Sequence, residues 1–150
     1  MANHEESLGR LISILYRTGQ SYIGRRLEPY GIGSGQFAFL AELLKHDGVS
    51  QDDLAVFFRC DKATVARALQ QLESRAYVRR EHSPADGRVN LVYVTDQARA
   101  FEPVLFEILS EWTETLARKL SITERSQAFE LLDRMVDNAS AALGSEKDII

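Results

Sequence analysis

Polar side chains between residues 62 and 75 have the chemistry of nucleic-acid contact. They comprise cations, a hydroxyl and an amide, groups that bind phosphates and base edges. At helical spacing one face would carry Lys62, Thr64, Arg67, Ala68, Gln71 and Arg75. The opposite face would carry the apolar residues Val65, Leu69, Leu72 and Ala76. Because any surface helix has a polar face, this pattern alone is only a modest indication of DNA binding.

A second cationic group follows in residues 77–95. Tyr77–Glu81 and Val89–Thr95 have the β-branched and aromatic content of strands, and a polar Asp-Gly loop joins them. We expect a β-hairpin whose tip carries Asp86 and Arg88. Arg88 could enter a minor groove, and Arg79 or Arg80 could contact phosphate. Asp86 is spaced to hold either the Arg88 side chain or a neighbouring backbone amide.

The charge of the chain is unevenly distributed. Residues 58–90 contain seven basic and four acidic residues, a net charge of +3, whereas the whole chain carries −4 and the remainder therefore −7. A basic patch on an acidic body fits local phosphate contact, although ordinary surface charge explains it equally well.

Helices are expected on both sides of this segment. Apolar periodicity predicts a helix over 8–28 and a second over 35–45, with Ser34 as its cap. Ser50, with Asp53 three residues later, begins a third helix that buries Leu54, Ala55, Phe57 and Phe58. Arg59-Cys60 is the turn, and Asp61 caps the fourth helix.

Two more helices are expected after the hairpin. Thr95-Asp96 begins a fifth helix that runs to about Leu120, and Ser121 with Glu124 forms a capping box for the last. The fold class is therefore mainly α (α+β), a winged helix-turn-helix lobe with terminal helices that pair two copies. The expected parts are 1–33 (dimerisation helix), 34–95 (DNA-binding lobe) and 96–150 (dimerisation helices).

The chain resembles the MarR family of transcription regulators across nearly its whole length, with the matching core in residues 50–95. The matching motifs are Leu54-Ala55, Asp61-Lys-Ala-Thr-Val-Ala-Arg67, Leu72-Glu73 with Tyr77-Val-Arg-Arg80, Asp86-Gly-Arg88 and Val94-Thr95. Ala76 replaces the family's usual glycine, so that turn must tolerate a Cβ, and Val94 replaces leucine.

The resemblance implies specific roles for these residues. Lys62, Thr64 and Arg67, with Gln71 as a weaker candidate, stand where the family meets the major groove; Arg88 is the wing arginine and Asp86 its support. It also implies a homodimer on double-stranded DNA, acting as a repressor on a pseudo-palindromic operator, and a small, often anionic aromatic effector. Residues that we expect to line the effector pocket are Arg17, Tyr16, Tyr30 and Phe37, with Phe39 and Trp112 as further walls. An ordinary ion pair at Arg17 and aromatic side chains in the core explain the same residues.

Other functional classes are less well supported. The sequence contains no catalytic or phosphate-loop motif, so we expect no enzyme and no cofactor. His4, His46 and His82 are scattered, which argues against a metal site. No apolar run is long enough to span a membrane and the first residues lack a signal-type apolar core, so we expect a cytoplasmic protein. Two alternatives remain open: redox sensing through Cys60, whose pKa Arg59, Lys62 and a helix start could lower, and a winged helix used only for protein contact.

Overall fold

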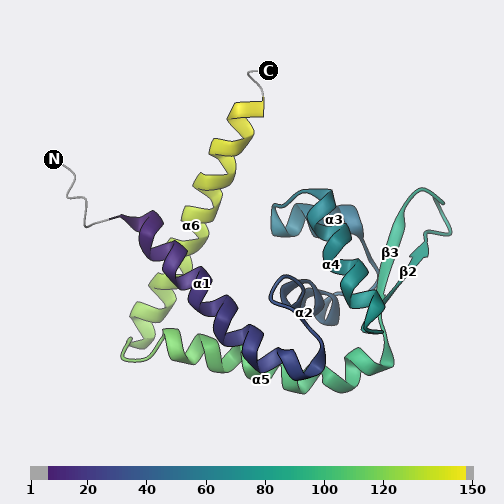
Figure 1. Ribbon diagram of the computed structural model, residues 1–150. Coiled ribbons are helices and arrows are strands. Elements are labelled where there is room, and N and C mark those ends of the chain that lie inside the picture. The colour runs from purple at the N-terminus through teal and green to yellow at the C-terminus, as the bar shows by residue number, and fades with distance from the viewer. Residues whose placement is uncertain (1–6, 148–150) are drawn as a thin grey trace. The chain divides into compact units, whose positions relative to one another are not determined.

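The computed structural model describes residues 7–147, which form two compact units. The first ends at Trp112 and the second begins at Thr113, and each is described by itself. The elements in chain order are α1 (Leu8–Leu27), a 3₁₀ turn (Glu28–Tyr30), α2 (Phe37–Lys45), β1 (Val49–Ser50), α3 (Gln51–Phe58), α4 (Lys62–Ser74), β2 (Val78–His82), β3 (Asn90–Val94), α5 (Asp96–Leu116) and α6 (Ile122–Lys147) (Figure 1). The mainly helical winged fold predicted from the sequence is thus confirmed.

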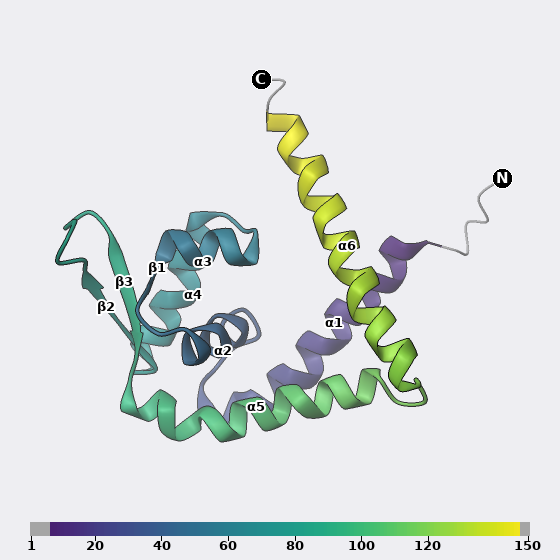
Figure 2. The same ribbon diagram turned by 180° about the vertical axis from the view of Figure 1, so that it is seen from behind.

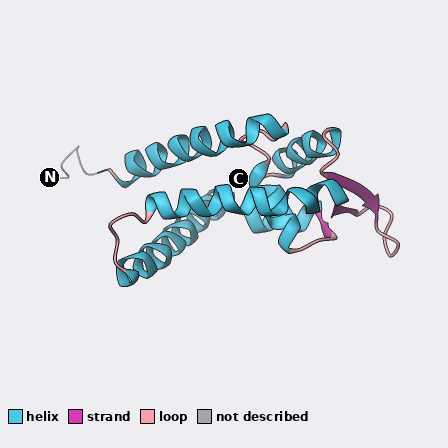
Figure 3. Cartoon of the chain, turned by 90° about the horizontal axis from the view of Figure 1, so that it is seen from below, coloured by secondary structure: helices cyan, strands magenta, loops and turns pink. Residues whose placement is uncertain are grey.

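The sheet has three antiparallel strands in the order β1-β3-β2. In the hairpin, Arg79 lies opposite Tyr93 and Arg80 opposite Val92. Figure 2 shows the hairpin projecting from the helices of the first unit, and Figure 3 shows its strands beside them. Strand β1 was not predicted from the sequence, because two residues are too short to show an alternation of polar and apolar side chains. Val49 of β1 pairs with Val92 on the free edge of β3.

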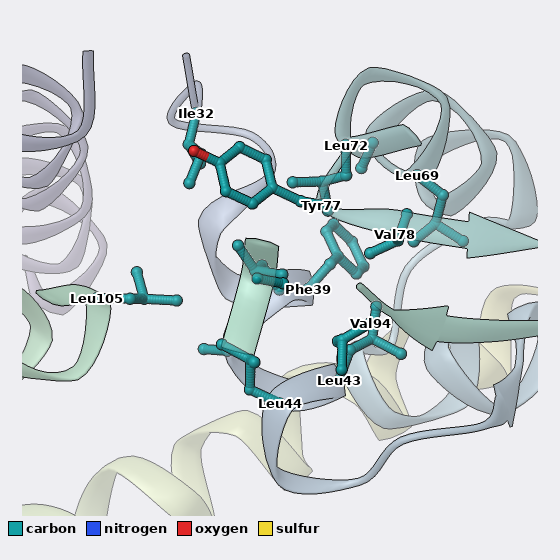
Figure 4. Close-up of a cluster of buried hydrophobic side chains, with 14 of the residues drawn as sticks. Ile32, Phe39, Leu43, Leu44, Leu69, Leu72, Tyr77, Val78, Val94 and Leu105 are labelled. Atoms are coloured by element: carbon teal, nitrogen blue, oxygen red, sulfur yellow. The ribbon is translucent and has the colours of Figure 1, made fainter. Parts of the chain in front are cut away.

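The core of the first unit lies between α2, α4 and the sheet. Leu43, Val65, Leu69 and Val92 are completely buried there, and Figure 4 shows Leu43 and Leu69 together with Val78 and Val94. Tyr77 is buried as well, and its hydroxyl donates to the carbonyl of Tyr30 at 2.6 Å. Burial of this kind is the main favourable contribution to folding, and it fixes the orientation of α4.

The start of α2 differs from the prediction. The helix begins at Phe37 and its N-cap residue is Gln36, without a side-chain cap. The Gln36 side chain reaches back instead, and its Oε1 accepts from the backbone N–H of Gly33 at 2.6 Å. Residues 34–36 therefore form a turn, and Ser34 does not cap the helix.

The apolar stripe predicted for α4 is wrong at its C-terminal end. Ala68, which we placed on the polar face, is buried, whereas Ala76 is exposed with φ +63°. Ala76 lies just beyond Arg75, the C-cap residue of α4. Two hydrogen bonds, Ala76 N–H to Glu73 at 3.0 Å and Tyr77 N–H to Leu72 at 2.9 Å, define a Schellman motif. A Cβ therefore occupies a left-handed position that usually favours glycine.

Two further expectations need correction. Phe57 of α3 is exposed rather than buried, although its ring contacts Phe58 edge-on. Helix α5 ends at Leu116, not near Leu120, because residues 117–119 form a turn in which Lys119 has φ +68°.

Within the first unit, the C-terminal half of α1 packs on α5. Tyr22 and Trp112 lie with ring centroids 5.1 Å apart, and Arg26 forms an ion pair with Glu111. Gly19 permits this approach, since a Cβ there would lie 3.1 Å from the Trp112 indole nitrogen. The apolar side chains of the first half of α1 are exposed in the single chain, namely Leu8, Leu11, Ile12, Ile14, Leu15 and Tyr16.

Asp47 joins the end of α2 to the sheet and to α5. Its Oδ1 accepts from the backbone N–H of Val94 at 2.8 Å and of Gly48 at 3.1 Å. Its Oδ2 lies 3.5 Å from Arg99, which also donates to the carbonyl of Leu44 at 2.9 Å. The turn at residues 46–48 therefore joins three elements.

The second unit contains the end of α5 and helix α6. Ser121 and Glu124 form the predicted capping box, with reciprocal hydrogen bonds of 3.1 and 2.8 Å. Arg125 bonds Glu114 at 2.7 Å, which joins the two helices across the turn. Among residues 7–147, no helix combines the length and the apolar character needed to cross a membrane.

Candidate nucleic-acid interface

The polar face of α4 is positioned by a cap at its first turn. Asp61 Oδ1 accepts from the backbone N–H of Thr64 at 2.6 Å, as the sequence predicts. This hydrogen bond lowers the pKa of the Asp61 carboxyl below its ordinary value, so the cap stays ionised. The cap fixes where the helix begins, and burial of Val65 and Leu69 turns the opposite side outward.

Three of the predicted contact residues lie along one concave surface. Thr64, Arg67 and Gln71 line a hollow of about 490 Å³, together with Gly35 and Gln36 from the turn before α2. Arg67 also donates to Thr64 Oγ1 at 3.4 Å, so the two side chains are neighbours on α4. The hollow thus brings cationic, hydroxyl and amide groups together on the exposed side of α4, and two segments far apart in the chain contribute to it.

Lys62 has an acidic neighbour on α3. Its ammonium lies 3.3 Å from Asp52 Oδ1, and the two side chains are 79% and 68% exposed. An ion pair so open to solvent contributes little to stability. Lys62 can therefore exchange Asp52 for another anion at small cost.

The two arginines of β2 have different surroundings. Arg80 donates to Glu73 at 3.1 Å and to Gln51 at 3.4 Å, and its side chain is only 27% exposed. The guanidinium lowers the pKa of the Glu73 carboxyl, so this pair is charged and joins β2 to α4. Arg79 binds Glu81 and lies over the ring of Tyr93, its guanidinium carbon 4.7 Å from the centroid. Of the two, Arg79 is the more accessible.

The tip of the hairpin is held by backbone hydrogen bonds. Asp86 Oδ1 accepts from the N–H of Arg88 at 3.0 Å, which decides between the two partners expected for Asp86. Ser83 donates its N–H to the carbonyl of Val89 at 2.8 Å and closes the loop. Within the described residues, no hydrogen bond or ion pair engages the Arg88 guanidinium. Arg88 is therefore an unpaired cation on a stiffened loop.

None of the four predicted effector residues lines the pocket that the structure has beside α1. Tyr16 and Arg17 are exposed on α1, the ring of Tyr30 lies 4.7 Å from Phe101, and Phe37 packs against the core. Trp112 and Phe39 are occupied by contacts with Tyr22 and Phe58. For these aromatic residues, core packing is the interpretation that the contacts favour.

Instead, a groove of about 590 Å³ lies beside the C-terminal half of α1 and is lined by other cations. Arg25 contributes from α1 and Arg75 from the end of α4. Arg75 was predicted on the polar face of α4, whereas Arg25 was not predicted as a site residue. Fifty residues separate the two in the chain, so no local spacing could have connected them.

Cys60 and the histidines give little support to redox or metal chemistry. Burial, with the Asp61 charge, raises the pKa of the Cys60 thiol, whereas the redox alternative requires its cationic neighbours to lower that pKa. A raised pKa means less of the reactive thiolate. Residues 7–147 contain no group of three or more His, Cys, Asp or Glu side chains arranged to hold a metal ion. His4 lies outside the described residues.

Comparison with known proteins identifies relatives along most of the chain. Residues 30–89 match the model of the MarR family. The crystal structure of a MarR transcriptional regulator from Methanosarcina mazei Go1 is 42% identical, with 88% of this chain and 95% of that chain covered and a TM-score of 0.81. The HTH-type transcriptional regulator BilQ of Clostridioides difficile is 27% identical over 91% of this chain and 92% of its own.

A further neighbour was solved together with DNA. It is a MarR family protein from Listeria monocytogenes complexed with a 26mer DNA; it is 17% identical, 91% of each chain is covered, and the TM-score is 0.86. At 17% identity, the similarity shows a shared fold only. The Methanosarcina relative is close enough, over nearly its whole length, to establish the family. The chain belongs to the MarR family of transcriptional regulators.

Proposed function

We propose that this regulator binds double-stranded DNA in a sequence-specific manner, with α4 in the major groove and the hairpin beside the minor groove. The observation that carries the proposal is the exposed set on α4, in which Thr64, Arg67 and Gln71 share one hollow. The Listeria neighbour, which has the same fold, was solved in complex with a 26mer DNA, and this supports DNA binding. Lys62 and Arg79 add cations that exposed ion pairs hold only weakly.

The hairpin tip supplies the second contact. Arg88 has no partner in the described part of the chain, while the Asp86 hydrogen bond orders the backbone from which it extends. An arginine presented in this way suits a narrow minor groove, where the negative potential is strongest. Arg80 instead serves mainly to hold β2 on α4, because Glu73 and Gln51 occupy its donors.

We infer further that the protein acts as a homodimer. The exposed apolar residues of α1 recur at helical spacing, as do Phe129, Leu132 and Val136 of α6. A soluble chain rarely leaves such stripes uncovered, and a second copy would bury them. A two-fold dimer places two α4 helices on half-sites about 34–36 Å apart, which requires a pseudo-palindromic operator. An operator that overlaps a promoter would give repression. The division into 1–33, 34–95 and 96–150 remains a prediction.

One experiment tests both proposals. Selection of bound DNA from a random pool, at two salt concentrations, should recover a pseudo-palindrome whose affinity falls as salt rises. A recovered single half-site would contradict the dimer. No salt-dependent recovery at all would contradict DNA binding and leave the hairpin and helices as a protein-contact module.

Control by an anionic aromatic effector through Arg17 belongs to the same proposal. Arg17 is exposed on α1 and a guanidinium binds carboxylate bidentately. Salicylate should loosen the operator complex of the wild type and have no effect on Arg17→Ala, as measured by gel shift and calorimetry. An unchanged response of Arg17→Ala would remove Arg17 from effector binding.

A further inference from the structure

The chain contains the dipeptide Asp-Gly twice, at residues 47–48 and at residues 86–87. Aspartate followed by glycine is prone to spontaneous isomerisation, because glycine has no side chain to shield the backbone nitrogen between the two residues. The first pair lies between α2 and β1, and the second lies in the loop of the hairpin. Since the two dipeptides have the same intrinsic chemistry, a difference in their rates must come from the surrounding structure.

The isomerisation requires the glycine nitrogen to meet the carboxyl carbon of the aspartate before it. The nitrogen attacks the protonated carboxyl group, an N–Cγ bond forms, and the Cγ–OH bond breaks. The hydroxyl leaves as water with the amide proton, and a cyclic imide remains. Water then adds to one of the two imide carbonyls. Opening at Cγ restores aspartate, whereas opening at the main-chain carbonyl breaks its bond to nitrogen and leaves isoaspartate, whose backbone runs through Cβ and Cγ. The water released in the first step balances the water consumed in the second.

At the first pair, both reacting groups are held by other residues. The Gly48 N–H donates to the carbonyl of Val92 at 2.9 Å and to Asp47 Oδ1 at 3.1 Å. The same Oδ1 accepts from the N–H of Val94 at 2.8 Å, and Oδ2 lies 3.5 Å from Arg99. Each hydrogen bond that must open before the attack slows the reaction about fivefold. The junction at Asp47 therefore protects this pair from isomerisation.

The second pair is open in both respects. Asp86 and Gly87 are exposed in the loop at the end of the projecting hairpin (Figure 2). Within residues 7–147, no hydrogen bond engages the Gly87 N–H. The space where a Gly87 Cβ would lie is empty to 4 Å, apart from the adjoining residues, so this peptide has room to rotate. The hydrogen bond of 3.0 Å from the Arg88 N–H folds the Asp86 carboxyl back over the Gly87 peptide. The nitrogen is thus free and its target is close.

We propose that Asp86 is a site of spontaneous isoaspartate formation, and that this modification of the hairpin loop weakens DNA binding as the protein ages. Formation of isoaspartate follows from the contrast between the two pairs, in which Asp47 is held by three elements and Asp86 by one backbone amide. The effect on DNA rests on the proposed function, whereas the modification itself does not.

The modification changes the part of the loop that presents Arg88. Isoaspartate adds one carbon to the backbone before Gly87 and moves the free carboxylate onto the Cα of residue 86. The Arg88 N–H then loses the acceptor that it has in the unmodified loop. A loop without this hydrogen bond is less ordered, so more conformational freedom is lost when Arg88 binds DNA. The affinity for the operator should therefore fall.

Peptide mapping of the full chain, incubated in mildly acidic buffer at physiological temperature, tests the modification. Isoaspartate is located by mass spectrometry and by the methyl group that an isoaspartyl methyltransferase transfers from S-adenosylmethionine. We expect isoaspartate to form at residue 86 at least about tenfold faster than at residue 47, as two hydrogen bonds on the Gly48 N–H require. In urea the two rates should converge, because the unfolded chain protects neither pair. Equal rates in the folded protein, or no isoaspartate at residue 86, would overturn the proposal.

A single methyl group provides the matched control. Gly87 does not have a positive φ, and a Cβ there meets open space, so Gly87→Ala leaves the loop unstrained. The added Cβ crowds the attacking nitrogen and should suppress isoaspartate at residue 86, while thermal unfolding stays that of the wild type. Asp86→Glu is a second control, because its longer side chain would have to close a six-membered ring, which forms more slowly. Undiminished isomerisation of Gly87→Ala would show that the glycine nitrogen is not the attacking group.

Operator binding before and after ageing tests the effect on DNA. The isomerised fraction, separated by ion-exchange chromatography, should bind the operator at least about tenfold more weakly, the effect of one lost charged contact. Gly87→Ala, aged in the same way, should keep its Kd, and repair by the methyltransferase should restore that of the wild type. Isomerisation with an unchanged Kd would overturn the effect on DNA. If the fresh protein binds no DNA, the proposed function fails, while peptide mapping still decides whether Asp86 isomerises.

Discussion

Ala76→Gly should stabilise the protein, although glycine usually has the opposite effect. Ala76 has φ +63° in the Schellman motif after α4. The left-handed conformation costs an L-residue about 1–2 kcal/mol. Glycine avoids this cost but adds about 0.4–1 kcal/mol of unfolded-state entropy. The expected net gain in the free energy of unfolding is about 0.5–1 kcal/mol, or about 1–4 °C in Tm for a chain of this size.

The same substitution on a helix provides the matched control. Ala100 is exposed within α5, where its backbone is helical. Ala100→Gly should therefore lower stability by about 0.5–1 kcal/mol. Chemical denaturation of both variants, at one protein concentration because association affects apparent stability, measures the difference. A loss of stability in Ala76→Gly as large as in Ala100→Gly would refute the argument that the backbone at residue 76 is strained.

Three other substitutions probe the interface and its supports. Arg88→Ala should weaken operator binding and reduce the slope of log affinity against log salt by about one if Arg88 meets a phosphate; an unchanged slope with altered sequence preference would indicate minor-groove shape readout instead. Asp52→Asn should tighten DNA binding at low salt, because Lys62 loses the acid 3.3 Å away, and titrations in which the variant binds no better would show that Asp52 does not compete with DNA. Asp61→Asn keeps a capping oxygen but cannot titrate. The folded-state pKa of Asp61 lies below its ordinary value of 3.8, so the ionised cap stabilises the wild type above pH 3.8. This stabilisation is lost as the pH falls through the folded-state pKa. Urea melts from pH 2 to pH 6 should therefore show a flatter acid limb in Asp61→Asn, and parallel limbs would rule out this role.

Local features of the chain were predictable because their causes are local. Ser50, Asp61 and Ser121 cap helices through hydrogen bonds to residues three positions away, and each does so in the structure. The hairpin was predictable for a similar reason, since its strands and Asp-Gly turn are adjacent in sequence. A cap at Ser34 was predicted wrongly, because residues 34–36 form a turn and the helix begins only at Phe37, after the N-cap residue Gln36.

Features that depend on distant contacts were not predictable. Strand β1 exists because Val49 meets the free edge of β3, forty-three residues further on. Whether Asp86 binds the Arg88 side chain or a backbone amide depends on the conformation of the loop, which the sequence does not show. Arg79 and Arg80 look alike in the sequence, yet Glu73 and Gln51 make only Arg80 a structural residue. The apolar face of α1 shows the limit most clearly: periodicity identified the stripe, but not that half of it stays uncovered in one chain.

Asp47 has a consequence for how the lobe can move. One carboxylate accepts from β3, closes the turn after α2 and lies beside Arg99 in the first turns of α5, while Arg99 donates in turn to Leu44. Any rotation of the start of α5 against the sheet must break several of these bonds at once. The start of α5, the end of α2 and the hairpin should consequently move together as one rigid body. A motion that repositions α4 would then need its hinge outside this junction.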